Sequence, residues 1–232
     1  MGIPEALLDR NLRRFRLRRH RLSVAGGKLS VVAPARADDL LEGRHRRTHH
    51  SPDSQPYWAE IWPASLGIAR HLMRGPSLAG RRVLDLGCGI GLAGLAAGLR
   101  GATVRFVDRD QDALHFACFN AADNGVVGFC ATRLDWFEAT VAGEYDLVLL
   151  ADVAYDESHC EPLLRHLRHC LAPGGAALLG DPYRQEADAF VDMLGLGFDL
   201  NTIHTGTFFA GRRVPLRLVH LTSTSASAKA PE

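Results

Sequence analysis

The chain has 232 residues, of which 47% are hydrophobic, and a formal net charge of +1. This length allows one sizeable core with at most a small appendage, and the near-neutral charge argues against a surface given over entirely to nucleic acid. The five cysteines include no CxxC pair and no apolar run approaches the roughly 20 residues of a membrane span, so we expect a cytoplasmic protein without disulfides, metal or membrane anchor.

The first 55 residues predict an N-terminal extension. A short basic helix is expected over residues 7–17, and alternating apolar and polar residues at 20–24 and 28–32, around Gly26-Gly27, predict a β-hairpin. Residues 34–56 are expected to form a loop. Arginines crowd the start of the chain, where they either dock an acidic protein or RNA or form a solvated face; they stand at positions 10, 13, 14, 16, 18, 19 and 21.

Strands and helices then alternate over a predicted domain spanning residues 56–221. This order predicts an α/β fold, a doubly wound and mostly parallel seven-stranded sheet whose last two strands form an antiparallel hairpin. The Ser/Ala-rich residues 222–232 are expected to be a disordered tail. Strands are predicted at 82–86, 103–108, 127–134, 145–151, 176–180, 198–208 and 214–221, and helices at 65–73, 91–99, 157–171, 185–194 and between Asp110 and Asn124.

A glycine-rich turn follows the first strand of this domain, with the sequence Asp85-Leu-Gly87-Cys-Gly89-Ile-Gly91. Such turns let the backbone pass close to a ligand at the carboxyl edge of an open α/β sheet. The turn resembles motif I of the class I methyltransferases, which bind S-adenosylmethionine. Gly89–Gly94 also fits the GxGxxG pattern of dinucleotide oxidoreductases. A carboxylate at Asp85 favours the first alternative, because it would repel a pyrophosphate but could hold the ammonium of a methionine moiety.

Acidic residues follow the next strands. By resemblance, Asp108 accepts the ribose hydroxyls, although it could instead cap a helix. Asp135 and Trp136 then border the adenine, with Trp136 as plain core filler the alternative. The predicted cofactor-binding residues are Trp62, Asp85, Gly87, Cys88, Gly89, Gly91, Asp108, Arg109, Asp135, Trp136 and Ala151.

The segment after the fourth strand, Asp152-Val-Ala-Tyr155, lies where the methyl acceptor is expected. It lacks the Asn/Asp-Pro-Pro-Tyr form of methylases that act on planar nitrogens. Together with the aromatic segment 56–65 and Gly180–Arg184, it resembles the family 16 seven-β-strand protein methyltransferases, and within them the branch of electron-transfer-flavoprotein β-subunit lysine methyltransferases and related bacterial proteins. Members that act on the flavoprotein usually carry Trp-Ala/Pro-Gly-Gly where this chain has residues 62–65 as Trp-Pro-Ala-Ser, which leaves the target open.

The resemblance implies methyl transfer to a lysine of a protein, with an electron-transfer-flavoprotein β-subunit-like or a ribosomal protein as candidate substrates. We predict Asp152 and Tyr155 as catalytic residues, with Asp152 accepting a hydrogen bond from the amine or serving the cofactor alone. Tyr57 and Trp58 are predicted to line a substrate channel or to act as packing staples. Glu60 is predicted as a substrate residue, and either Glu60 or Trp62 is predicted to close over the methionine portion.

Two other functions stay open. One is methylation of a small-molecule amine or heteroaromatic nitrogen, because this fold serves many acceptors. The other is a non-enzymatic binding module that kept the fold and contacts RNA or protein through its basic start. Asp181 and Arg184 form either a structural ion pair or a substrate contact. His45, His49 and His50 lack partnering cysteines, so no metal role is expected for them.

Overall fold

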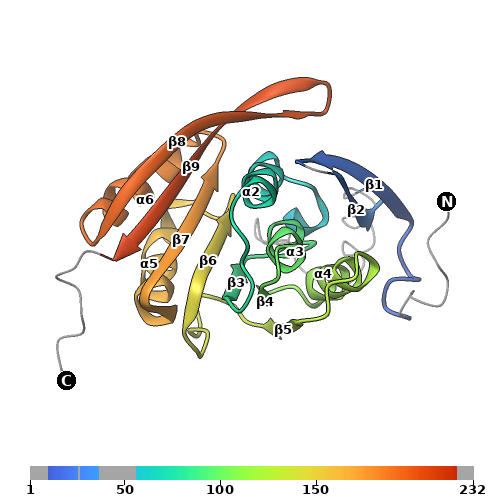
Figure 1. Ribbon diagram of the computed structural model, residues 1–232, viewed down its shortest axis with the longest axis horizontal. Coiled ribbons are helices and arrows are strands. Elements are labelled where there is room, and N and C mark those ends of the chain that lie inside the picture. Colours follow the sequence, from blue (N-terminus) through green and yellow to red (C-terminus); the bar gives the residue numbers. More distant parts are fainter. Residues whose placement is uncertain (1–9, 26, 37–55, 224–232) are drawn as a thin grey trace, which may run out of the picture.

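A computed structural model describes residues 10–25, 27–36 and 56–223. Their centre is a seven-stranded sheet in the order β5-β4-β3-β6-β7-β9-β8 (Figure 1). All neighbouring strands are parallel except β9, which runs antiparallel to both β7 and β8. The strands are β3 (Arg82–Leu86), β4 (Thr103–Asp108), β5 (Phe129–Arg133), β6 (Tyr145–Ala151), β7 (Leu171–Asp181), β8 (Phe198–Phe209) and β9 (Arg212–Ser223). The predicted fold class is confirmed.

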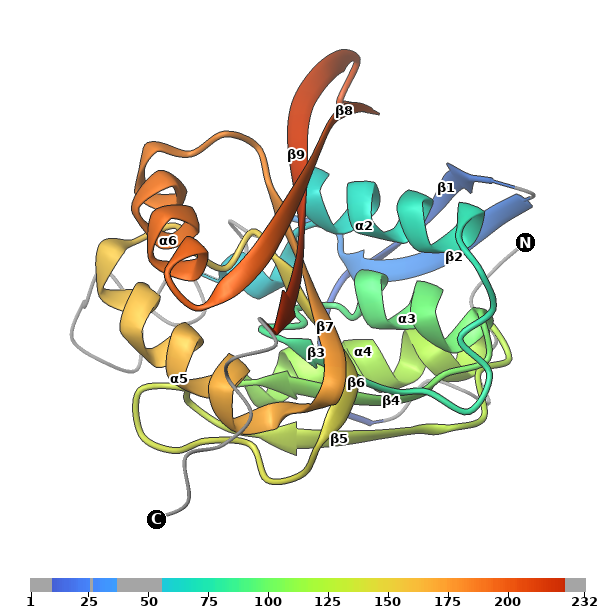
Figure 2. The ribbon, with the colours of Figure 1, turned by 60° about the vertical axis from the view of Figure 1, so that its left-hand side comes forward.

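Helices cover both faces of the sheet (Figures 1 and 2). One face carries α2 (Pro63–Arg74), α3 (Leu92–Leu99) and α4 (Gln111–Asp123), and the other carries α5 (Cys160–Cys170) and α6 (Gln185–Gly195). Two short 3-10 helices, η3 (Tyr57–Ala59) and η4 (Glu157–His159), precede α2 and α5. No helix in these described ranges is long and apolar enough to span a bilayer.

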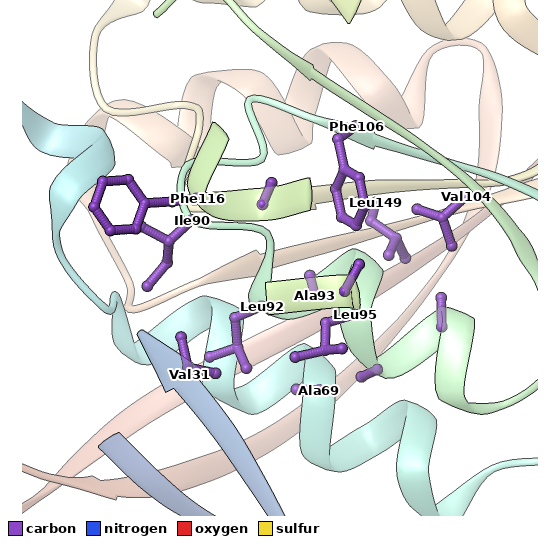
Figure 3. Close-up of a cluster of buried hydrophobic side chains, with 14 of the residues drawn as sticks. Val31, Ala69, Ile90, Leu92, Ala93, Leu95, Val104, Phe106, Phe116 and Leu149 are labelled. Carbon is purple, nitrogen blue, oxygen red and sulfur yellow. The ribbon is translucent and has the colours of Figure 1, made fainter. Parts of the chain in front are cut away.

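The core on the α2–α4 face is built from small and apolar side chains. α3 consists only of Leu, Ala and Gly, which lets it pack closely between the sheet and its neighbours. Figure 3 shows Leu92 and Leu95 of α3 near Val31 and Ala69, and Phe106 of β4 near Leu149 and Val104. Phe106 and Leu95 are fully buried, and each such side chain contributes about 1.5–3 kcal/mol to folding.

The N-terminal hairpin packs onto this face as part of the same core. Its strands are β1 (Leu17–Val24) and β2 (Gly27–Pro34), each longer than predicted. Asn120 of α4 is fully buried and holds β2, because it accepts from the Val32 N–H at 2.8 Å and donates to the Val32 carbonyl at 3.0 Å. The same amide donates to the Ile90 carbonyl at 2.9 Å, so one side chain ties the hairpin to the glycine turn.

Several predicted elements differ from the structure. The helix expected over residues 7–17 is wrong for its described part, because residues 10–15 form turns and Leu17 already belongs to β1. Leu12 and Phe15 turn inward there, Leu12 being fully buried and Phe15 packing on Phe116. The strand expected at 127–134 is shorter, as β5 begins at Phe129. Residues 222 and 223 belong to β9, and the rest of the predicted tail and residues 37–55 of the predicted loop lie outside the described residues.

The last two strands form a long hairpin that rises beyond the sheet (Figures 1 and 2). β8 is the edge strand, and most of its side chains are exposed. The apolar residues Leu216, Leu218, Val219 and Leu221 of β9 are buried, since that strand lies between β7 and β8. The hairpin tip lies above α2, on the side of the molecule that carries β1.

Candidate active site

The glycine turn between β3 and α3 forms the floor of a cleft at the carboxyl edge of the sheet. The N–H groups of Gly87 and Cys88 donate to the Val107 carbonyl at 2.8 and 2.9 Å, which fixes the turn against β4. Gly89 has a φ of +52°, and a Cβ there would lie 3.2 Å from the Trp58 carbonyl oxygen. Glycine is therefore required at Gly89 by both the backbone angle and the space.

Asp85 lies beneath the turn and does not line the cleft. It is 1% exposed, and one carboxylate oxygen accepts from the Gly94 N–H at 2.8 Å. The other oxygen has no hydrogen-bond partner among the described residues. Burial raises the pKa of Asp85 to about 7, against the lowering effect of the Gly94 hydrogen bond. The predicted contact with a methionine ammonium stays a prediction, since in this arrangement Asp85 chiefly holds the start of α3.

Asp108 lines the cleft at the end of β4. Its two oxygens accept from the N–H groups of Gly89 and Asp110, each at 2.9 Å. Burial raises the pKa of Asp108 to about 6, opposed by these two hydrogen bonds. The alternative role as helix cap falls to Asp110, whose side chain accepts from the Asp112 N–H at the start of α4. Asp108 is thus free of the capping role and is joined to the glycine turn instead.

Asp135 and Trp136 form the wall of the cleft beyond β5. Asp135 accepts from the Phe137 N–H at 3.0 Å, which bends the chain so that Trp136 turns inward. The indole lies over Gly87, where an added Cβ would come within 2.9 Å of the Trp136 ring. The Trp136 ring is partly buried and its centroid lies 5.4 Å from that of His159. Both predicted roles of Trp136, a wall of the site and a part of the core, fit this position.

Aromatic side chains surround the mouth of the cleft. Tyr57 is 44% exposed, and its ring centroid lies 5.5 Å from Tyr155 and 6.1 Å from Trp62. The Trp62 indole N–H donates to the Tyr57 carbonyl at 2.8 Å, which locks the two ends of the aromatic segment together. Trp58 differs, because it is 8% exposed and its ring packs on Phe15 and Phe116. The packing alternative therefore describes Trp58 better than the predicted substrate channel.

The carboxylate of Asp152 is engaged by Arg184. Arg184 donates from Nε to Oδ1 at 2.6 Å and from Nη2 to Oδ2 at 3.2 Å. The Arg184 guanidinium also lies 5.7 Å from the Trp62 ring centroid. Asp152 has a φ of +59°, which is rare for a residue with a side chain, and it does not line the cleft. The hydrogen bonds that Arg184 donates to Asp152 raise the pKa of the Arg184 guanidinium, against the lowering effect of its burial.

Asp181 and Arg184 do not form the ion pair that was one of their two predicted alternatives; only the backbone N–H of Arg184 donates to Asp181, at 3.2 Å. The side-chain partner of Asp181 is Arg217, which donates from Nε at 2.7 Å and also pairs with Asp188 at 2.6 Å. Arg217 comes from β9, which runs beside β7, and so it reaches Asp181 across the register of the two strands. Arg184 therefore pairs with Asp152, and this ion pair joins the segment that follows β6 to the segment that follows β7.

Most predicted site residues come together in this one cleft. Asp85, Gly91 and Asp152 lie behind its surface. Six residues line it without having been predicted, namely Ser65, Ile90, Leu92, Ala93, Asp110 and Val153. Asp110 was expected only as a helix cap, and the other five offered no chemical signal in the sequence. The predicted residues that line the cleft are Tyr57, Trp58, Glu60, Trp62, Gly87, Cys88, Gly89, Asp108, Arg109, Asp135, Trp136, Ala151 and Tyr155.

The cleft fits S-adenosylmethionine in three respects. The glycine turn brings backbone to its floor without side chains, Asp108 offers a carboxylate at its wall, and Trp136 offers an aromatic face. Burial and the neighbouring acids raise the pKa of Cys88 far above its ordinary value, so the thiol in the turn is no nucleophile. Among the described residues, no three His, Cys, Asp or Glu side chains group as metal ligands; His45, His49 and His50 lie outside them.

Comparisons with known proteins identify the family to which this chain is similar. A family described as lysine methyltransferase matches residues 54–195. The zebrafish (Danio rerio) electron transfer flavoprotein beta subunit lysine methyltransferase is 38% identical over 139 residues, covering 58% of this chain and 53% of the relative. The protein N-lysine methyltransferase METTL21A of the same species is 34% identical over 155 residues, covering 63% of this chain and 71% of that relative. The chain spans about half the length of the flavoprotein-directed relatives it matches.

Among solved structures, the N-methyltransferase NodS from Bradyrhizobium japonicum WM9, in complex with S-adenosyl-L-homocysteine, superimposes with a TM-score of 0.59. It is 17% identical and covers 78% of this chain and 97% of its own, so this likeness shows the fold. The family match covers more than half of the chain, from the aromatic segment to the end of α6. The dinucleotide alternative for the glycine turn is thereby set aside. The chain belongs to the lysine methyltransferase family, within the S-adenosylmethionine-dependent methyltransferases that its sequence motifs resemble.

Proposed function

We propose that this chain transfers a methyl group from S-adenosylmethionine to a lysine side chain of a protein. The observation that carries the proposal is the junction of two features in one cleft. The glycine turn and Asp108 form its inner end, and the aromatic mouth of Tyr57, Trp62 and Tyr155 forms its outer end. An exposed aromatic mouth suits a long alkyl stem that carries its amine inward.

S-adenosylmethionine supplies, when bound, a methyl group on a positively charged sulfur that is ready for in-line displacement. Asp108 would accept the ribose hydroxyls with its remaining lone pairs while keeping the Gly89 N–H. Trp136 would cover the adenine, and Arg109, Asp135 and Ala151, which also line the cleft, would contact the same molecule. Trp62 and Glu60 would close over the methionine portion.

The lysine must lose a proton before it can react, because its ordinary pKa is about 10.4. Aromatic walls and a nearby positive charge both disfavour an ammonium ion, so the cleft favours the neutral amine. Tyr57 and Tyr155, whose rings already contact each other, would line one side of the alkyl stem, and the proton would leave to water at the open mouth. The residues then act mainly by alignment and by excluding water from the reacting atoms.

Asp152 would direct the amine once Arg184 gives up part of its contact. A carboxylate has about four acceptor positions, so two hydrogen bonds from Arg184 leave capacity for one more. The side chain of Asp152 is nearly fully buried, and so the guanidinium must shift for the amine to reach it. In this proposal Arg184 acts as a positioning residue, holding Asp152 and packing on Trp62 until substrate enters.

We also propose which proteins carry the acceptor lysine. The relatives suggest an electron-transfer-flavoprotein β-subunit-like protein, and ribosomal proteins are the second candidates. All five cysteines are free thiols, and we propose the cytoplasm as the compartment of the protein, together with a place in a bacterial branch of the family.

The deciding experiment is incubation of the chain with isotopically labelled S-adenosylmethionine and a cell lysate, followed by mass spectrometry. We expect label on lysine residues of one or a few proteins, and none with a Gly89→Leu variant. Label confined to small molecules would instead indicate an amine N-methyltransferase. Binding of S-adenosyl-L-homocysteine without any transfer would indicate a binding module.

A further inference from the structure

A second groove opens beside the candidate active site. The groove has a volume of about 620 Å³ and is lined by residues of the β1–β2 hairpin, α2 and the tip of the β8–β9 hairpin. Figure 1 shows these three elements on the same side of the molecule. Arg18 and Arg21 of β1 form one wall, and Phe208, 66% exposed at the hairpin tip, forms the other. Ile61 and Leu66 contribute an apolar floor. The groove is therefore made by segments that lie nearly 200 residues apart in the chain.

The groove is strongly basic. Four arginines line it, namely Arg18, Arg21, Arg36 and Arg70, while Glu60 is the sole carboxylate among its described lining residues. Arg18 and Arg21 are exposed to solvent. The chain as a whole carries a formal net charge of only +1, so this concentration of positive charge is local. Such a surface attracts acidic groups and speeds their association.

The two hairpins that form the walls are held in place by Arg70. This residue of α2 donates from Nε to the Ser23 carbonyl of β1 at 3.0 Å, and from Nη1 to the Thr207 hydroxyl of β8. Thr207 is 1% exposed, so the second contact is buried. One side chain therefore bridges the N-terminal and C-terminal hairpins across the floor of the groove.

The groove adjoins the candidate active site, because Glu60 lines both. A chain segment whose lysine passes Tyr57 into the cleft would lay its neighbouring residues along the arginines. Glu60 would attract the lysine ammonium at the junction, and the arginines would attract carboxylates on either side of it. The same carboxylate at the junction disfavours a phosphate backbone, which selects a protein segment over a nucleic acid.

We propose that this groove binds acidic residues that flank the acceptor lysine, so that the substrate is an acidic protein segment. The inference rests on the proposed function and specifies its substrate class. Arg18 and Arg21 would recognise the flanking carboxylates, and Phe208 would cover the bound segment. Specificity is then carried by the N-terminal hairpin and by the tip of the β8–β9 hairpin, and the cleft itself has only to recognise a lysine.

The test uses a fluorescein-labelled peptide, Glu-Glu-Ser-Lys-Ser-Glu-Glu, and the same peptide with Gln in place of Glu. Binding to the full chain is measured by fluorescence anisotropy in the presence of S-adenosyl-L-homocysteine. We expect the acidic peptide to bind about tenfold more tightly than the neutral one, and the Arg18→Glu/Arg21→Glu double variant to lose about that factor, since each exposed ion pair contributes up to about 1 kcal/mol. Arg168→Glu, on α5 at the far face of the sheet, should leave binding unchanged.

If the introduced glutamates disturb the hairpin, an Arg18→Gln/Arg21→Gln variant replaces them, and its thermal melt checks that it is folded. This variant should also bind the acidic peptide more weakly than the wild type. Equal binding of the two peptides, or an unchanged affinity in the double variants, overturns the proposal. Tighter, arginine-dependent binding of a short oligo(dT) strand overturns it in favour of nucleic acid. Peptide binding that appears only in an Asp38→Asn/Asp39→Asn/Glu42→Gln variant overturns it in favour of the chain's own segment 37–55 as the occupant.

The peptide also separates this inference from the proposed function. Arginine-dependent binding of the acidic peptide with no methyl transfer to any lysine supports the groove and counts against the enzyme. Transfer to both peptides at equal rates, unaffected by the arginine variants, supports the enzyme and removes the groove from substrate recognition.

Discussion

Arg184 and Asp152 are joined by a two-point ion pair across the carboxyl ends of β6 and β7, with contacts of 2.6 and 3.2 Å. The pair fixes the carboxylate that follows β6 with a residue at the start of α6, in the segment that follows β7. It also brings a guanidinium to the face of Trp62, so that the acid, the arginine and the aromatic mouth form one unit.

Replacing Asp152 by Ala should reduce methyl transfer by on the order of 100-fold, because the amine loses the group that orients it. Affinity for S-adenosyl-L-homocysteine should stay within a few-fold of the wild type, since Asp152 does not line the cleft. Transfer is measured with labelled cofactor on the lysate, and affinity by calorimetry. Full activity in this variant would remove Asp152 from the acceptor site.

Replacing Arg184 by Ala should lower kcat more than it raises KM for the lysine substrate, because the arginine positions Asp152 and Trp62 rather than binding the amine. Arg184→Lys should restore less than half of the lost rate, since a lysine cannot make the two-point contact. The steady-state constants of both variants check this. A change confined to KM would instead indicate direct contact between Arg184 and substrate.

Replacing Gly89 by Leu should abolish cofactor binding. The position has a φ of +52°, and a Cβ would lie 3.2 Å from the Trp58 carbonyl, so the turn must open to admit the side chain. Gly125→Leu is the matched control, because Gly125 also has a positive φ of +80° but has open space around it. The control should cost about 1–2 kcal/mol in stability and leave calorimetric binding intact.

The free energy of unfolding of the cofactor-free protein should fall as pH rises from about 4 to about 7. Burial raises the pKa of Asp85 from 3.8 to about 7, so the folded protein keeps a proton that the unfolded chain releases in this interval. The slope from one such group is at most about 1.4 kcal/mol per pH unit. Asp85→Asn should reduce this slope, with Asp108 still contributing below about pH 6, whereas Asp192→Asn, at an exposed position on α6, should leave it unchanged. Urea unfolding at a series of pH values measures the difference; equal slopes in the wild type and Asp85→Asn would contradict the assignment.

Replacing Asn120 by Ala should lower the free energy of unfolding by about 2–4 kcal/mol, because both the N–H and the carbonyl of Val32 lose their partner in a buried place. Asn124→Ala makes a milder control, since Asn124 bonds Ser30 in the same way but is only partly buried. Denaturant unfolding should rank the two variants in that order, and a reversed order would show that Asn120 is not the main anchor of the hairpin.

The sequence alone was sufficient to predict the sheet, the bounds of three of its seven strands and the place of the cleft. β3, β4 and β6 have the predicted limits, because buried parallel strands are short apolar runs flanked by helices. The residues that follow such strands meet at one edge of the sheet whatever the details of packing. The positions of Gly87, Gly89, Asp108 and Tyr155 along the chain were therefore enough to assign them to one cleft.

Only the tertiary structure decided which side chains pair and which are hidden. Asp85 lies beneath the turn, Arg184 engages Asp152 because Arg217 takes Asp181, and the predicted N-terminal helix yields to turns that bury Leu12. The basic groove joins Arg18 to Phe208, at opposite ends of the chain. Local sequence patterns specify whether a segment is a helix or a strand and where it ends. The partner of a charged side chain depends instead on contacts between segments that are distant in sequence, and spacing along the chain does not specify those contacts.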